Sequence, residues 1–232
     1  MKFIFQFFEK VWSYFYTPDK DDLQLLSEEE YKEIFIKGRS KADIQLTYEK
    51  AWQAKNFEIE LYWKRASYFW AFQIAAFAGY FSVHSSKTYQ DRVSPQTLFF
   101  VVCIGFVTAL AWRFTNKGSK SWQRHWEIHV DMLENEITGP LYKIITSPKT
   151  FSVSKINEIV SHFTVMIWVI LGAKYFADHL CIGSNCGEIS FQIIFSMLGV
   201  VYFSGAMILG HGRGRFGNRQ VKFYKRKFTI NR

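Results

Sequence analysis

Long uncharged segments alternate with charged segments along the whole chain. Asp, Glu, Lys and Arg are absent from four stretches: 66–86, 93–112, 159–173 and 189–212. A helix that crosses a hydrocarbon core of roughly 30 Å needs about 20 mainly apolar residues. The pattern therefore predicts an all-α membrane protein with four transmembrane helices. We place these helices at 65–86, 93–112, 156–177 and 189–210.

The first predicted span is the end of a much longer helix. No proline or glycine occurs between Lys41 and Gly79. A helix from Lys41 to about Val83 would be roughly 60 Å long, about twice the hydrocarbon thickness. Half of it must therefore project from the membrane, within a cytoplasmic helical segment that we place at 18–64. An apolar stripe follows the projecting half at Ile44, Tyr48, Trp52, Ile59 and Trp63.

The second predicted span also continues into a charged segment, 113–155. No proline interrupts that segment before Gly139-Pro140, which ends the helix. A second apolar stripe recurs there, at Trp122, Trp126, His129, Leu133 and Ile137. We therefore expect the first two spans to extend together as a helical stalk, with the two stripes facing each other or neighbouring subunits.

Two shorter helices are expected before the stalk. The aromatic-rich segment 1–17 suits a helix lying in the cytoplasmic membrane interface, with packing on the protein's own cytoplasmic part as the alternative. Its uncharged run is too short for a signal peptide. Ser27 and Glu30 have the spacing of a capping box, which predicts a helix from Glu28 toward Gly38.

The basic residues indicate which side of the membrane each segment occupies. The formal net charge is +9, and 26 of the 29 Lys and Arg residues fall on one side if the four spans alternate. The positive-inside rule then places both termini and 113–155 in the cytoplasm, at the bacterial inner membrane. The tail at 211–232 is expected to contact anionic lipid headgroups rather than nucleic acid. Its assigned residues are Arg213, Arg215, Arg219, Lys222, Lys225, Arg226 and Lys227.

Two of the three cysteines lie in a predicted external loop. Cys181 and Cys186 stand five residues apart, where an oxidising compartment permits a disulfide. Two free thiols in a turn are the alternative. Cys103 lies within the second predicted span.

Small residues recur at helical spacing within the spans. They are Ser67, Ala71, Ala75 and Gly79 in the first span, and Gly105 and Ala109 in the second. Small side chains let helix backbones approach closely in lipid. The spacing therefore indicates packing either within one chain or between subunits.

Large and acidic residues form a distinctive group in the stalk. The group comprises Trp122, Trp126, Glu127, Leu133 and Glu134. Tryptophans one turn apart bury much area, and the carboxylates can pair with basic residues of neighbouring helices. Plain helix packing, a subunit interface and a docking surface for a cytoplasmic protein partner all remain open.

Candidate chemistry is sparse in this sequence. His125 and His129 have the spacing of a helical zinc site, but Glu127 lies on a different face and no third ligand is evident. We therefore expect no metal and no cofactor, and expect a stalk histidine that is hydrogen-bonded to Glu127, Asp131 or a neighbouring chain. A membrane enzyme would have to use these three residues together with Asp131.

The uncharged segments carry no acidic residue at the membrane midplane, which disfavours an ion-coupled carrier. An oligomeric pore is still an alternative, because channels can conduct and gate without charged residues. Its lining would use Gln73, Gln192, Ser196 and Ser204.

The segment from Trp112 is spelled WRFTNKGSKSWQRHWEIHVDMLE and is followed by GPLYK. This spelling resembles the signature of the RipA-type small bacterial inner-membrane proteins. The matching positions are Asn116, Gly118, Ser119, Lys120, Trp122, Gln123, Trp126, Glu127, Asp131, Leu133 and Glu134. The resemblance implies an octameric protein of the cytoplasmic membrane that has no assigned catalytic activity and offers no catalytic residue.

These features predict a non-enzymatic, homo-oligomeric scaffold or sensor that presents helical stalks to the cytoplasm. Its expected partners are membrane lipids, further copies of the chain and a cytoplasmic protein. A role in envelope stress or phage defence is a hypothesis. An oligomeric channel is the first alternative, and a membrane enzyme is the second.

Overall fold

The computed structural model describes residues 26–85, 95–145, 151–179 and 191–209. Within these ranges the chain forms α-helices, one short 3-10 helix and no strand, which agrees with the all-α prediction. The elements are α2 (Glu28–Phe35), α3 (Lys41–Ser85), α5 (Pro95–Leu133), η1 (Glu134–Glu136), α6 (Val153–His179) and α7 (Phe191–Leu209). The predicted interfacial helix at 1–17, the Cys181 and Cys186 pair and the basic tail at 211–232 lie outside the described residues.

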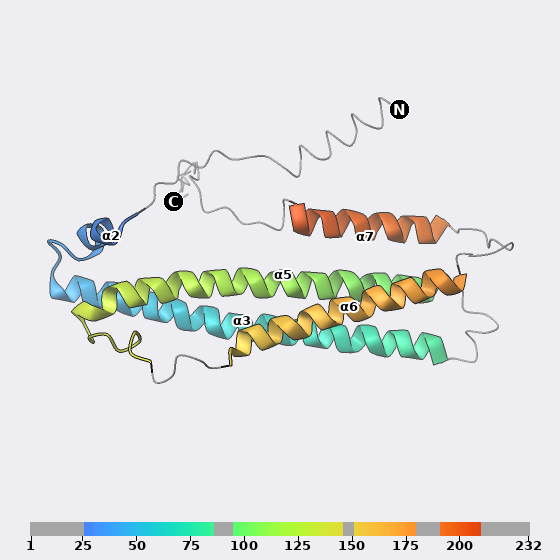
Figure 1. Ribbon diagram of the computed structural model, residues 1–232, viewed down its shortest axis with the longest axis horizontal. Helices are drawn as coiled ribbons and strands as arrows, with labels where there is room; N and C mark the ends of the chain where they lie inside the picture. The colour runs from blue at the N-terminus through green and yellow to red at the C-terminus, as the bar shows by residue number, and fades with distance from the viewer. Residues whose placement is uncertain (1–25, 86–94, 146–150, 180–190, 210–232) are drawn as a thin grey trace, which may run out of the picture.

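Two long helices form the frame of the molecule. α3 and α5 run antiparallel, side by side, over most of their length (Figure 1). α6 packs against α5 along the half of this hairpin that contains the uncharged segments. α7 lies beside α5 on the side away from α3. α2 lies at the end of the hairpin where α3 begins and α5 ends, away from α6 and α7.

Local capping explains where the first two helices begin. The Glu30 backbone N–H donates to Ser27 Oγ at 3.2 Å, and the Ser27 N–H donates to Glu30 Oε2 at 2.8 Å, so the predicted capping box is confirmed. Gly38 then turns the chain with a φ of 75°, a conformation that favours glycine. Ser40 caps α3 by accepting from the Asp43 N–H at 3.2 Å.

One face of α3 stays buried from the stalk to the membrane half. Its buried residues are Ile44, Ala51, Lys55, Tyr62, Ala66, Gln73 and Tyr80. From Ile44 to Gln73 they alternate steps of seven and four residues, which together make an 11-residue repeat, and Tyr80 follows after a further seven. This repeat has about 3.67 residues per turn, close to that of a straight α-helix, so one face can follow its neighbours without a strong supercoil.

The predicted stalk stripe on α3 is wrong in detail. Of its five members only Ile44 is buried, while Trp63 is 36% exposed. The hydrophobic pattern selected large apolar residues, whereas the true seam includes Lys55 and Gln73. A polar residue can occupy a seam when its polar atoms find partners there.

Three helices are long and apolar enough to cross a membrane among the residues described: Gln96–Glu136, Val153–Asp178 and Phe191–Ile208. Four spans were predicted, and 65–86 in α3 is not among the three. That segment contains only one charge, Arg65, but its serines, tyrosines, tryptophan and Gln73 lower its mean hydropathy. Gln96–Glu136 carries its apolar residues in its first half, because charged residues resume at Arg113.

The apolar core lies where α3, α5 and α6 meet. Trp168 of α6 is 1% exposed and stacks on Phe77 of α3, with ring centroids 4.4 Å apart. On the α5 side the indole lies directly over Gly105, where a Cβ atom would overlap the ring. Gly105 is therefore required for α5 and α6 to approach this closely.

We expect Gly105→Ala to destabilise the helix bundle. The added methyl group would push Trp168 out of its packed position, and overpacking of this kind costs about 1–3 kcal/mol. The measurement is the thermal unfolding midpoint in detergent. Gly118→Ala is the matched control in the same helix, because nothing lies within 4 Å of its Cβ position. Equal midpoints for the two variants would contradict this account of the packing.

Candidate functional site along the helical hairpin

Polar side chains link α3, α5 and α6 at successive levels of the hairpin. In the uncharged half, Gln73 is 5% exposed and is the centre of one such link. The Trp168 Nε1–H donates to Gln73 Oε1 at 2.7 Å, and Gln73 Nε2 donates to Thr108 Oγ1 at 2.8 Å. The Thr108 hydroxyl in turn donates to the Ile104 carbonyl oxygen at 2.8 Å. One residue from each helix thus sets the relative height of the three helices.

A second polar cluster lies just beyond the uncharged segments. Asn157 Nδ2 donates to Tyr62 Oη at 2.8 Å and to Asn116 Oδ1 at 3.2 Å. The Tyr62 hydroxyl donates to the Ser154 carbonyl oxygen at 3.2 Å. Burial raises the pKa of Tyr62, which keeps the phenol protonated and able to donate. This cluster anchors the start of α6 to both helices of the hairpin.

Arg65 marks the boundary between the two halves of α3. Its guanidinium donates to Ser119 Oγ at 2.8 Å and lies 3.5 Å from Glu58 Oε2. Ser119 is buried and belongs to the segment that resembles the RipA-type signature. The last charge before the apolar half is therefore directed across the hairpin to α5.

Lys55 is buried near the far end of the hairpin and is 9% exposed. Its Nζ lies 3.4 Å from the Trp52 ring centroid and 4.6 Å from that of Tyr142. Burial lowers the pKa of Lys55, and the charges of Glu127 and Asp131 oppose that shift. Aromatic faces stabilise a cation that has lost its water.

The chain that follows α5 folds back onto the hairpin through Glu134. This carboxylate is fully buried, accepts from the Tyr142 backbone N–H at 2.8 Å and lies 3.9 Å from Lys143 Nζ. Gly139 has a φ of 72°, which allows the sharp turn between them. Glu134 therefore positions Tyr142 over Lys55.

α2 docks on the other side of α5 through a histidine. The Tyr31 hydroxyl lies 2.7 Å from His129 Nδ1, and Phe35 contacts the same imidazole edge-on. Burial lowers the pKa of His129, and the neighbouring His125 lowers it further. Burial also raises the pKa of Tyr31 to about 12. A neutral imidazole and a protonated phenol therefore share this hydrogen bond.

The predicted stalk residues of α5 divide between two faces. Leu133 and Glu134 are fully buried toward the hairpin, whereas Trp122 is 40% exposed. Trp126 packs against His129, on the face that α2 partly covers. The predicted stripe on α5 therefore does not face α3 as a single surface.

The remaining predicted residues also fall in different places. Glu127 lies 3.8 Å from Lys120, a pairing within α5. Among the described residues no three His, Cys, Asp or Glu side chains are grouped for a metal ion. The small residues separate as well: Gly105 and Ala109 are buried within the chain, whereas Ser67, Ala71 and Ala75 are exposed.

Sequence reasoning missed most of the polar links between the helices. Gln73 was considered only as a pore residue, and Tyr62, Lys55 and Asn157 were not singled out. The 11-residue spacing from Ile44 was the signal that could have identified the seam.

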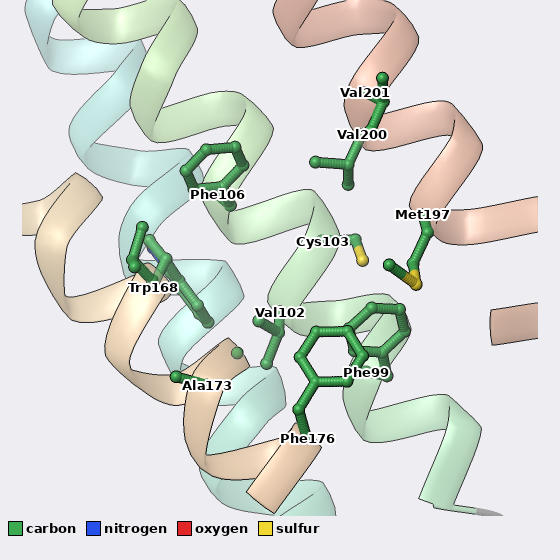
Figure 2. A pocket seen from close by; sticks show the side chains of 12 residues that line it. Phe99, Val102, Cys103, Phe106, Trp168, Ala173, Phe176, Met197, Val200 and Val201 are labelled. Atoms are coloured by element: carbon green, nitrogen blue, oxygen red, sulfur yellow. The ribbon is translucent and has the colours of Figure 1, made fainter. Parts of the chain in front are cut away.

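Apolar cavities flank α7 on both sides. Figure 2 shows the cavity of about 350 Å³ between Phe99, Trp168 and Phe176 and the α7 residues Met197 and Val200. A second cavity of about 330 Å³ lies on the other flank of α7. A third cavity, of about 290 Å³, has a more polar lining, with Gln96, Thr97, Gln192 and Ser196. α7 is therefore loosely packed on its own chain.

Residues 45–177 match the model of one protein family, described as the octameric membrane protein family (8xMP). The match covers more than half of the chain and contains the α3–α5 hairpin with nearly all of α6. No curated protein and no solved structure matches the chain.

We expect Gln73→Met to destabilise the three-helix contact. The change keeps the side-chain length but leaves the Trp168 N–H buried without its acceptor, which costs about 1–3 kcal/mol. The thermal unfolding midpoint should therefore fall. Ile74→Met is the control, because Ile74 is the exposed neighbour of Gln73. An equal loss in both variants would mean that the hydrogen bonds add nothing to stability.

Acidification should release α2 from the stalk. The folded pKa of His129 lies below its usual value of 6.5, so docking is fully supported above that value and weakens as the pH falls through the folded pKa. Protonation of His129 would place a charge in this partly buried contact, beside the His125 ring, whose centroid is 4.8 Å from that of His129. Hydrogen exchange in 28–35, corrected for its intrinsic pH dependence, should be faster at low pH. His129→Gln should remove most of this pH effect, and an unchanged effect would assign it to another group.

Proposed function

Because the chain belongs to the octameric membrane protein family, we propose that it acts as a non-enzymatic, homo-oligomeric scaffold or sensor of the bacterial inner membrane. In this role it presents helical stalks to the cytoplasm. The observation that carries the proposal is the continuity of α3 and α5. Each runs without a break from an uncharged segment into a charged one, and hydrogen bonds join them at Gln73–Thr108 and at Arg65–Ser119.

The polar links support a membrane position for α3 as well. Gln73 bonds to Thr108 and Trp168, which lie in the uncharged parts of two candidate spans. A helix held at the same height between those spans has to cross the bilayer with them. Four spans then place both termini on one side, and the excess of Lys and Arg assigns that side to the cytoplasm.

The stalk has the features of a surface that responds to a partner. α2 is a short helix attached through Tyr31 and Phe35 around one imidazole, on an otherwise rigid hairpin. Displacing so small an element costs little compared with unfolding the hairpin. A cytoplasmic protein that competes with α2 for the His129 face is therefore our candidate for the stimulus or the client. The likeness to the RipA-type proteins supports such a role without naming it, and envelope stress or phage defence remains the biological hypothesis.

The polar side chains of the stalk bond to other side chains, which supports a non-enzymatic role. The candidate catalytic group of the stalk is divided among structural contacts: His129 bonds to Tyr31, and Glu127 pairs with Lys120. A nucleophile or general base needs a partner that activates it. His129 instead bonds to Tyr31 of α2, and Glu127 pairs with Lys120 within α5.

An oligomeric pore is the second candidate function, and one observation favours it. Gln96, Thr97, Gln192 and Ser196 line a cavity between the start of α5 and the start of α7. Polar groups at the starts of these two helices could line a water path when several copies surround an axis.

The test of the proposed function combines particle mass with permeability. In nanodiscs the full chain should form particles of eight copies, with protein density extending from one face only. Reconstituted vesicles should retain both ions and small dyes. Ion or dye release that scales with protein content would replace the scaffold with the pore. A monomer in nanodiscs would contradict both.

A further inference from the structure

Membrane orientation restricts how eight copies can assemble. All copies in one membrane share the same orientation, so a two-fold axis in the membrane plane is impossible. The simplest arrangement of equal subunits is then a ring about the membrane normal. In a ring every contact joins two different surfaces of the chain. Each subunit must therefore offer one surface to the copy before it and another to the copy after it. This step depends on the membrane arrangement proposed above.

The outer face of α3 has the composition of a helix contact surface. Four small residues are exposed on it: Ser67, Ala71, Ala75 and Ala78. They lie opposite the buried seam that contains Gln73 and Tyr80. We call this face the α3 groove, because large side chains border it on both sides. Those bordering side chains are Trp70 and Ile74 on one side and Tyr68 and Phe72 on the other.

Gly79 does not belong to the α3 groove, although it continues the four-residue spacing. A Cβ atom at Gly79 would lie 3.9 Å from Val101 of α5, so this glycine faces its own chain. The small residues of α3 thus serve two contacts. Only those that point away from α5 are available to a second copy.

α7 presents the complementary shape. Four large residues at steps of four, three and four form one exposed face, which we call the α7 ridge. They are Phe191, Phe195, Leu198 and Tyr202, each more than half exposed. The ridge lies opposite Ile193, the residue of α7 that is buried on its own chain.

The groove and the ridge lie on opposite flanks of the subunit. α3 and α7 are on the two sides of α5, and the end of α3 is level with the start of α7 (Figure 1). Two different surfaces on opposite flanks are what a ring requires. A row of large side chains fits between helix backbones only where the facing helix carries small ones.

We propose that the α7 ridge of one subunit packs into the α3 groove of the next subunit in the ring. The two helices are antiparallel, because α3 ends and α7 begins at the same side of the membrane. Counting inward from Ser85 and from Phe191 pairs Ala78 with Leu198 and places Ala75 opposite Val201, one residue from Tyr202 of the ridge. The occupant of the α3 groove is thus a second copy of this chain.

Paired cysteines test the contact directly. In a chain whose three cysteines are replaced by serine, Ala78→Cys and Leu198→Cys are introduced together and oxidised in native membranes. A disulfide needs Cα atoms about 4.4–6.8 Å apart. The double variant should give a ladder of cross-linked species up to eight copies, which collapses on reduction. Each single variant should stay monomeric on the gel.

The matched control moves one cysteine to a different exposed face. Ile170 of α6 is exposed and follows Trp168 by two residues. Because Trp168 bonds to Gln73, Ile170 lies at a membrane depth similar to that of Gln73. Ile170→Cys combined with Leu198→Cys should give no ladder. A ladder from this pair in place of the first, or dimers from a single variant, would overturn the proposed contact.

Particle mass separates failure of this contact from failure of the oligomer. A second double variant carries cysteines at Ala75 and Tyr202. If wild-type particles contain eight copies but both double variants stay monomeric on the gel, the ring uses other surfaces and this inference is wrong. Ala75→Trp adds an independent check, because it fills the α3 groove. It should reduce the octamer fraction, whereas Ile170→Trp should not.

Discussion

The need to satisfy one buried amide determines how the helices are arranged. Gln73 lies in a region with little water, where an unpaired polar group costs several kcal/mol. Its amide is satisfied only when Trp168 and Thr108 stand at the same height. A shift of any helix by one turn, about 5.4 Å, would break the bonds. Apolar packing could tolerate many registers, whereas these directional bonds select one.

The same restriction continues outside the apolar half. Asn157 bonds to Tyr62 and Asn116, and Arg65 bonds to Ser119 on the facing helix. Because these links are spread along α3 and α5, they fix the relative position of the two helices at several points. The scaffold or sensor role proposed above rests on this continuity.

α7 is the exception, because Ile193 is its one buried residue among those that the structure describes. It packs on α5 through few buried residues and is flanked by apolar cavities. In lipid such a helix gains little from hydrophobic burial on its own chain, since lipid tails are as apolar as the helix surface. Neighbouring subunits can supply the packing that the chain itself omits. The family match ends at residue 177, before α7 begins.

The sequence by itself determined the helical class, the length of α3 and the capping of α2 by Ser27. These depend on local properties: charge-free runs, the absence of proline and glycine, and side chains that bond to nearby backbone. The resemblance of the residues after Trp112 implied an octamer, and the family match agrees with that expectation. Only the tertiary structure decided which face of each helix is buried, because Lys55 and Gln73 become acceptable in a core when residues distant in the chain supply their partners. For the same reason it separated Gly79, which faces α5, from Ala75, which is exposed: the contact of a small residue depends on which helix lies opposite.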